Sequence, residues 1–260
     1  MITEKKYIVQ SNWKMHKTHP EAMDWIDSLK KGASDLTERI QLIICVPYVH
    51  LRAVSHATSN FSQISSGAQN VHWETAGAFT GEISAPMLAD AGAQYCVVGH
   101  SERRDYFAEN DEMVNCKSKL LLQSGINPIV CIGESIEQRN KALTFNQLER
   151  QVITCFEGLT EVEMNRTVVL YEPIWSIGTG NSATPQQAQE AHHFIRNMLE
   201  RIFSKETAQA TRIMYGGSVK THNVEAIIKG EDIDGVGAGS GSLNVQDFLN
   251  IARSCSNYLQ

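Results

Sequence analysis

Short apolar runs typical of buried β-strands alternate along this chain with longer segments in which apolar residues recur at helical spacing. The apolar runs predict eight strands, at residues 7–13, 42–46, 64–69, 95–98, 128–132, 167–171, 212–215 and 233–238. The periodic segments predict helices that include residues 21–30, 111–123, 142–156, 186–203, 222–228 and 245–252. Two helix starts carry capping signals, because Ser135 precedes Gln138 by three residues and Thr184 directly precedes Pro185.

Strands that are apolar on both faces and separated by helices indicate a parallel sheet covered by helices. Eight such units in about 250 residues favour a closed (β/α)₈ barrel over an open sheet. An open sheet would also be expected to carry a dinucleotide-binding glycine pattern after its first strand, and none follows residues 7–13. With no internal repeat, linker or shift in composition, residues 1–260 are predicted to form one α/β domain.

Composition describes an ordinary globular protein, with 42% apolar and 20% charged residues. No apolar run approaches the roughly 20 residues of a membrane-spanning helix, and the N-terminus lacks the long apolar segment of a secretion signal. Three of the six cysteines, Cys45, Cys96 and Cys131, lie in apolar runs, and no Cys-x-x-Cys pair occurs. We therefore expect a cytosolic protein with reduced core thiols and no membrane partner.

The net charge of −6, the absence of a basic run and the low aromatic content argue against a nucleic-acid partner. An anionic ligand would need a site that is locally positive against this overall charge.

Polar and glycine residues follow most of the predicted strands. Active sites of (β/α)₈ barrels lie at the carboxyl ends of the strands, so these residues are expected to converge on one rim. They are Asn12, Lys14, Gln69, Asn70, residues 99–102, Glu172, residues 216–218 and residues 237–242. Glycine-rich loops that precede a helix can hold phosphate through backbone amides, which makes a phosphate monoester the natural ligand.

A carboxylate, an imidazole and an ammonium close together suit the removal of a proton next to a carbonyl group. Glu172, His100 and Lys14 would supply these three groups. Taken singly, His100 could be a buried structural histidine and Lys14 a surface lysine; their joint placement at three strand ends favours catalysis. His192 and His193 are assigned to the polar face of a helix. No metal-ligand spacing and no serine nucleophile motif competes with this interpretation.

Seven segments resemble the triosephosphate isomerase family, in the same order and over nearly the whole chain. They are NWKM at 12–15, GAQN at 67–70, GAFTGEIS at 77–84, VGHSERR at 98–104, CIGE at 131–134, YEPIW at 171–175 and YGGSV at 215–219. The HSERR and YEPxW blocks together are the most specific.

This resemblance implies a TIM barrel that interconverts glyceraldehyde 3-phosphate and dihydroxyacetone phosphate through an enediolate, with no cofactor and no metal. It implies that Glu172 shuttles the proton, that His100 is the neutral electrophile for which this family is the standard example, and that Lys14 is the electrostatic partner of the substrate. Asn12 would assist at the substrate oxygen. Glu102 would orient Lys14, and Ser101 would hold Glu172 before substrate binds.

The resemblance also implies a mobile lid at 173–183, a phosphate site and a homodimer. Lid residues would be Pro173, Ile174, Trp175, Ile177, Thr179 and Gly180. Amides that bind phosphate would belong to Gly178, Ser218, Gly239 and Ser240. Thr80 would lie on a long loop that projects toward the partner's site.

The end of the last strand departs from the family pattern. Gly237 stands where the family usually has a leucine that presses on the base opposite Ile177, so the sequence predicts open space beside Glu172. Ser240 replaces a glycine and would be strained if its φ were positive. A roomier pocket leaves open a four-carbon substrate such as L-erythrulose 1-phosphate. A barrel that binds a phosphate ligand without turning it over is the third alternative.

Overall fold

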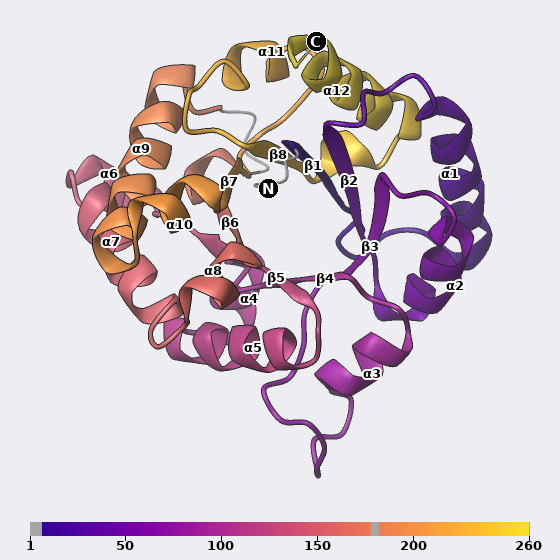
Figure 1. The fold of residues 1–260 in the computed structure, drawn as a ribbon, viewed down its shortest axis with the longest axis horizontal. Coiled ribbons are helices and arrows are strands. Elements are labelled where there is room, and N and C mark those ends of the chain that lie inside the picture. The colour runs from indigo at the N-terminus through magenta and orange to yellow at the C-terminus, as the bar shows by residue number, and fades with distance from the viewer. Residues whose placement is uncertain (1–6, 178–181, 260) are drawn as a thin grey trace.

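Eight parallel strands close into one barrel in the part of the chain that the computed structural model describes, residues 7–177 and 182–259 (Figure 1). Each strand pairs with the next along the chain, and β8 pairs with β1. The strands are β1 Tyr7–Asn12, β2 Ile40–Cys45, β3 Ile64–Ala68, β4 Tyr95–Val98, β5 Asn127–Ile132, β6 Val168–Tyr171, β7 Arg212–Tyr215 and β8 Gly235–Ala238. The predicted (β/α)₈ barrel is confirmed, with strand ends displaced by up to two residues.

Helices surround the barrel on its outside (Figure 1). They are α1 His19–Gly32, α2 Tyr48–Thr58, α3 Ala85–Asp90, α4 Ser101–Phe107, α5 Asp111–Gln123, α6 Ile136–Asn140, α7 Thr144–Cys155, α8 Glu161–Asn165, α9 Pro185–Ile202, α10 Lys205–Ala210, α11 Val224–Ile227 and α12 Val245–Tyr258. Two 3₁₀ turns, η1 Ile174–Ser176 and η2 Ser240–Ser242, follow β6 and β8. The periodic segments predict the longer helices well, whereas α2, α3, α4, α8 and α10 are not among the predicted helices.

Local signals explain several helix boundaries. Ser135 forms a capping box with Gln138, and Thr184 is the N-cap of α9 with Pro185 as the first helical residue, both as predicted. Thr184 also forms a capping box with Gln187, which was not predicted. Helix α7 begins two residues later than predicted because Ala142 has a φ of +56°, which no helix can continue. The assignment of His192 to a polar helix face is wrong. Its side chain is fully buried against the barrel, and only His193 lies on the exposed side of α9.

Apolar side chains pack in two layers, one inside the barrel and one between the barrel and the helices. The inner layer is formed by Ile8, Ile43, Cys45, Tyr95, Val97, Ile129, Cys131, Val168, Leu170 and Met214. Strand β8 contributes little bulk to it, because Gly235 and Gly237 take two inward positions and leave their space to neighbouring strands. Cys45, Cys96 and Cys131 are buried and unpaired, as predicted.

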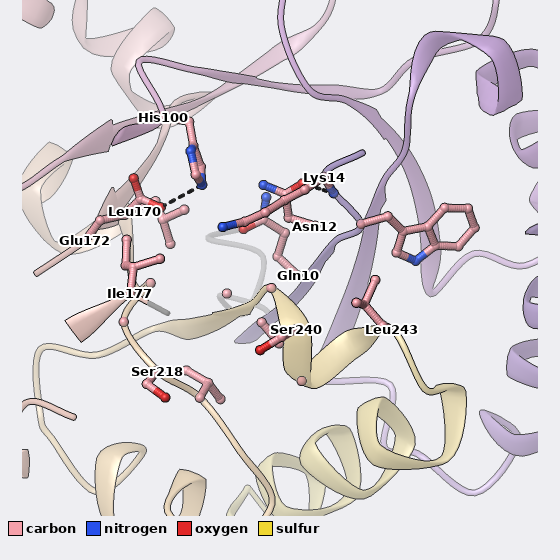
Figure 2. Close-up of a pocket in the computed structure, with 18 of the residues that line it drawn as sticks. Gln10, Asn12, Lys14, His100, Leu170, Glu172, Ile177, Ser218, Ser240 and Leu243 are labelled. Carbon is pink, nitrogen blue, oxygen red and sulfur yellow. Dashed lines mark hydrogen bonds and ion pairs between the residues drawn. The ribbon is translucent and has the colours of Figure 1, made fainter. Parts of the chain in front are cut away.

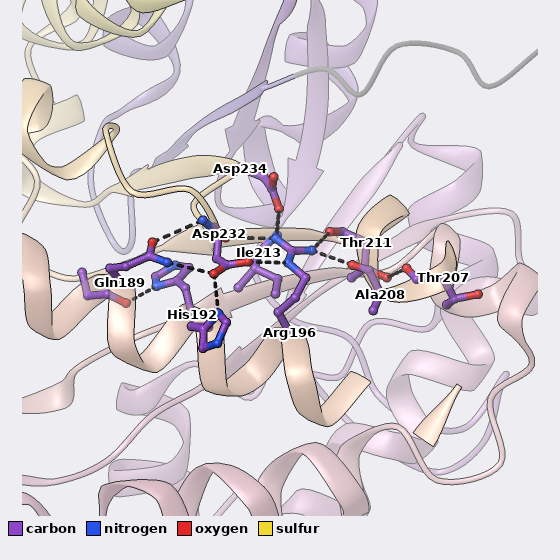
Figure 3. A network of polar contacts seen from close by, with 11 residues as sticks. Gln189, His192, Arg196, Thr207, Ala208, Thr211, Ile213, Asp232 and Asp234 are labelled. Atoms are coloured by element: carbon purple, nitrogen blue, oxygen red, sulfur yellow. Dashed lines mark hydrogen bonds and ion pairs between the residues drawn. The ribbon is translucent and has the colours of Figure 1, made fainter. Parts of the chain in front are cut away.

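A buried arginine joins α9 to the chain around β7 and β8 (Figure 3). Arg196 donates to the carboxylates of Asp232 (3.2 Å) and Asp234 (2.6 Å). It also donates to the carbonyl oxygens of Ala208 (2.6 Å) and Thr211 (2.7 Å). The planar guanidinium thereby connects three segments of the chain at one point: α9, residues 208–211 and residues 232–234.

None of the helices in the described ranges is long and apolar enough to cross a membrane.

Candidate active site

Polar residues from the ends of five strands, β1, β4, β6, β7 and β8, line one pocket at the carboxyl rim of the barrel, with a cavity of about 150 Å³ (Figure 2). The predicted site residues found there are Asn12, Lys14, His100, Glu172, Ile177, Ser218, Gly239 and Ser240. Ser101 and Glu102 lie behind this lining and reach it through hydrogen bonds. Gly178, Thr179 and Gly180 fall outside the described residues. Thr80 is exposed on the loop between β3 and α3, which projects from the barrel (Figure 1).

Glu172 follows β6 directly and is only 4% exposed. Its backbone N–H donates to the Ile132 carbonyl oxygen at 2.7 Å, so β5 holds its main chain. A Cβ atom at Gly133 would lie 1.7 Å from the Glu172 carbonyl oxygen, which means that only glycine fits there. The backbone of the carboxylate is therefore fixed from the neighbouring strand.

Two donors face the carboxylate of Glu172. The Ser101 backbone N–H lies 3.2 Å from Oε2, and the His100 Nε2 atom lies 3.2 Å from Oε1. Ser101 is the first residue of α4, where backbone N–H groups have no partner within the helix. The start of α4 thus holds the carboxylate on the His100 side of the pocket.

The hydrogen bonds of His100 define its tautomer. His100 is the N-cap residue of α4, and its Nδ1 atom accepts from the Glu102 backbone N–H at 3.2 Å. An accepting Nδ1 carries no proton, so the neutral ring carries its proton on Nε2, the atom that faces Glu172. The N–H group of the imidazole therefore points into the pocket.

An ion network behind the pocket anchors the turn that carries His100. Glu109 accepts from the Gly99 backbone N–H at 2.8 Å, from Arg103 at 2.8 Å and from Lys117 at 2.6 Å. Burial acts to raise the pKa of Glu109, but Lys117 and Arg103 together hold it below its usual value. The carboxylate therefore stays charged and keeps all three donors.

Lys14 is held in an uncommon backbone conformation, with a φ of +51°. Its backbone N–H donates to Asn12 Oδ1 at 3.0 Å, and its carbonyl oxygen accepts from the Gln69 amide at 3.0 Å. The ammonium group lies 2.6 Å from Glu102 Oε1. Strained residues of this kind are common at functional sites, where the surrounding contacts maintain them. Asn12, Gln69 and Glu102 together direct the Lys14 ammonium into the pocket.

The opposite side of the pocket is rich in backbone amides and hydroxyl groups. Ser218 follows β7, Gly239 follows β8, and Ser240 opens η2. A second ammonium lies here, since Lys220 Nζ donates to Ser240 Oγ at 2.9 Å. Ser240 does not have a positive φ, so the strain that the sequence suggested is absent from this residue. Together with Lys14, these groups make this end of the pocket suited to an anion despite the net negative charge.

The first residues of the predicted lid are anchored to β5. Trp175 Nε1 donates to Glu134 Oε1 at 2.9 Å, and the Ile174 N–H donates to the Glu134 carbonyl oxygen at 3.1 Å. The Tyr171 hydroxyl donates to the same carboxylate at 3.0 Å. Pro173 begins this segment, and Ile177 reaches the pocket. Glu134 is fully buried, so it fixes the start of the segment firmly.

The predicted open space beside Glu172 is wrong. A Cβ atom at Gly237 would lie 3.1 Å from Leu170 Cδ1 and 2.9 Å from Gln10 Oε1. Both side chains line the pocket, so they occupy the volume that Gly237 leaves. Leu170 from β6 and Gln10 from β1 therefore fill the space that a side chain at Gly237 would take.

Sequence reasoning missed four residues of the site: Gln10, Glu134, Leu170 and Lys220. Leu170 could have been found, because it lies two positions before Glu172 on β6 and must face the same side as the carboxylate. The segment containing Glu134 was noted only as part of a motif. The same alternation applies to Gln10, which lies two positions before Asn12 on β1. Lys220 gave no signal, since it lies in the loop after β7 and only the tertiary structure brings it to the pocket.

No group of three or more His, Cys, Asp or Glu side chains in the described ranges is arranged to hold a metal ion.

The chain forms a closed (β/α)₈ barrel, and a carboxylate, a neutral imidazole and an ammonium surround one pocket at its rim. This arrangement is the framework of an isomerase that moves a proton between neighbouring atoms. Comparison with known proteins agrees, because the sequence pattern described as "Triosephosphate isomerase" matches residues 7–255. The chain belongs to the triosephosphate isomerase family.

Similar proteins span nearly the same length. Triosephosphate isomerase of Syntrophotalea carbinolica is 46% identical over 249 residues, covering 96% of this chain and 98% of that protein. Triosephosphate isomerase of Alkaliphilus oremlandii is 43% identical over 247 residues, covering 95% and 98%. That of Endomicrobium trichonymphae is 43% identical over 249 residues, covering 96% and 98%.

Proposed function

We propose that this enzyme interconverts D-glyceraldehyde 3-phosphate and dihydroxyacetone phosphate by proton transfer through an enediolate. The observation that carries the proposal is the pair formed by Glu172 and His100, with Oε1 and Nε2 3.2 Å apart. A carboxylate can remove the proton from carbon while the neutral imidazole N–H stabilises negative charge on the neighbouring oxygen. Family membership and the relatives' names support the same reaction.

The remaining polar groups would stabilise the negative charge that develops on the substrate oxygen, or hold the groups that do so. Lys14 supplies positive charge to the substrate oxygen and phosphate, and Asn12 assists at that oxygen. Glu102 orients Lys14, with which it shares a 2.6 Å ion pair. Ser101 holds Glu172 through its backbone N–H until the carboxylate turns to the substrate.

Phosphate binding is assigned to the end of the pocket that carries amides and hydroxyl groups. Ser218, Gly239 and Ser240 would donate backbone N–H groups to the phosphate oxygens. Gly178 would add a further amide from the lid segment 173–183. Closure of that segment would exclude water from the reacting groups, which strengthens their charge interactions.

The alternative four-carbon substrate loses its main support. It depended on open space beside Glu172, and Leu170 and Gln10 occupy that volume. A barrel that only binds its phosphate ligand would have no need for the paired Glu172 and His100.

Purified enzyme assayed with glyceraldehyde 3-phosphate tests the reaction. We expect efficient turnover and at least tenfold lower kcat/KM for L-erythrulose 1-phosphate. Glu172→Asp retracts the carboxylate by one methylene, which should lower kcat by about 100-fold while the substrate still binds. The exposed Glu225 provides the matched control Glu225→Asp, with full activity expected. Full activity of Glu172→Asp would exclude Glu172 as the base.

A cytosolic homodimer is the form we propose for the enzyme. The loop that carries Thr80 is exposed along residues 73–82, including the aromatic rings of Trp73 and Phe79. Met15, next to the catalytic lysine, is 94% exposed. Apolar side chains on a projecting loop and beside the pocket are suited to burial against a second copy of the chain. Sedimentation of the purified protein at twice the monomer mass would agree, and a monomer at micromolar concentration would refute the dimer.

A further inference from the structure

Two neighbouring positions of the barrel rim have no side chain. Gly237 pairs with Gln10 on β1, and Gly216 follows the Tyr215–Val236 pair that joins β7 to β8. On its other side, Gly216 is next to Glu172, because Tyr215 pairs with Tyr171. The two glycines therefore lie in one row of the barrel between Gln10 and Glu172.

One leucine occupies the space in front of both glycines. A Cβ atom at Gly216 would lie 2.8 Å from Leu170 Cδ1 and 3.0 Å from Glu172 Cγ. A Cβ atom at Gly237 would lie 3.1 Å from the same Leu170 Cδ1. Leu170 lies on β6, two residues before Glu172, and its side chain occupies this space beside Glu172 (Figure 2).

Packing around Leu170 is tight and faces the pocket. Its side chain is 3% exposed and lines the cavity together with Glu172 and Ile177. Contact distances near 3 Å from the missing Cβ atoms leave no room for a side chain at either glycine unless Leu170 moves, and at Gly237 the end of the Gln10 side chain must move as well. A large residue at position 170 and a large residue at position 237 therefore exclude each other.

We propose that Leu170 is the positioning residue of the base, and that Gly216 and Gly237 are glycines in order to admit it. Leu170 supports the methylene stem of Glu172 from below and closes the floor of the pocket to water. A side chain on β8 cannot have this role while Leu170 is present. This inference rests on the proposed function, because it assigns Leu170 to the same proton transfer.

A double-mutant cycle on Leu170→Ala and Gly237→Leu tests it, with kcat, KM and Tm measured for each protein. We expect Leu170→Ala to lower kcat about tenfold with KM changed less than about twofold, because the base is misplaced while the phosphate contacts remain. We expect Gly237→Leu to lower both kcat and Tm, the latter by about 5 °C, through overpacking. The double variant should recover Tm and part of kcat, since each change makes room for the other.

Val168→Ala is the matched control, because Val168 is an inward-facing residue of the same strand, two positions further from the pocket. It should lower Tm without changing kcat. A kcat for Leu170→Ala that stays at the wild-type value, as in the control, would overturn the positioning role. Additive effects on Tm in the cycle would overturn the mutual exclusion. If the wild-type protein failed to isomerise glyceraldehyde 3-phosphate, the proposed function would be wrong. Non-additive Tm changes in the cycle would still show that positions 170 and 237 share one space.

Discussion

The imidazole Nε2 of His100 and the carboxylate Oε1 of Glu172 lie 3.2 Å apart, and the proton between them belongs to the imidazole. In the proposed reaction the substrate takes the place of that contact, so that each of the two groups faces the substrate. The carboxylate would then meet a carbon-bound proton, and the imidazole would meet the adjacent oxygen.

His100→Gln should lower kcat/KM by about 10²- to 10³-fold, which lies within the usual contribution of a group that transfers a proton in the reaction. Glutamine has an N–H group of similar reach, but it cannot pass a proton between two oxygens. Steady-state assays in both reaction directions measure the loss. His193→Gln, on the exposed side of α9, is the control and should keep wild-type kinetics. Less than a threefold loss for His100→Gln would contradict the electrophile role.

Trp175→Phe should lower kcat severalfold, because it removes the indole N–H that donates to Glu134 at 2.9 Å. The start of the lid segment would then be held less firmly, and lid motion limits turnover in many enzymes. Stopped-flow measurement of ligand binding should show altered closing and opening rates. Trp73→Phe changes a half-exposed ring on the projecting loop and should leave these rates unaltered. Unchanged rates in Trp175→Phe would show that the contact with Glu134 does not govern the lid.

Arg196→Met should lower the free energy of unfolding by about 3 to 5 kcal/mol, because it removes the buried guanidinium that balances the charge of two partly buried aspartates. Urea denaturation measures this directly, and kcat of the folded fraction should stay close to wild type. Arg253→Met removes a more exposed pair with Asp35 and should cost less than about 1 kcal/mol. Equal losses of unfolding free energy in the two variants would mean that the buried network stabilises the fold no more than the exposed ion pair does.

Acid should destabilise the enzyme through His192. Burial lowers the pKa of this imidazole from 6.5 to about 4, and its Nδ1–H donates to the Ala188 carbonyl oxygen at 2.7 Å. The unfolded chain therefore binds a proton that the folded chain does not, and stability rises with pH between these values. The contribution is complete above pH 6.5, is lost as the pH falls through about 4, and amounts to about 3 kcal/mol at most.

Unfolding free energies measured between pH 4.5 and 7 for His192→Gln provide the test of that contribution. The variant should be less stable at pH 7 but should lose less stability on acidification than the wild type. His222→Gln, at an exposed position, should follow the wild-type curve. Parallel curves for His192→Gln and wild type would assign the acid sensitivity to other groups.

The barrel could be predicted because its strands are buried on both faces and its helices are strongly periodic. Short helices were harder to find. Helix α4 begins inside the polar segment that follows β4, so the strand-end residues Ser101 and Glu102 are also its first turn. The position of His192 was misassigned because two adjacent histidines give no indication of which one faces the barrel.

Individual residues of the site could be predicted where each one ends a strand, because the architecture brings those ends together. The packing beside Glu172 could not. A glycine at 237 indicates a missing side chain, but only the register shows that Leu170 and Gln10 fill the gap. Volume at one position of a barrel is shared among strands, and a single sequence does not show how.

The close approach of Gly133 to Glu172 has a consequence for how this site can change. β5 carries none of the proposed catalytic side chains, yet its end is in main-chain contact with Glu172, and even one methyl group at Gly133 would overlap the carbonyl oxygen of Glu172. The position of the Glu172 main chain is therefore fixed by a strand that has no residue in the lining of the pocket. Other residues around the pocket can be substituted as it adapts to another ligand, but Gly133 cannot, because any side chain there would overlap the main chain of Glu172.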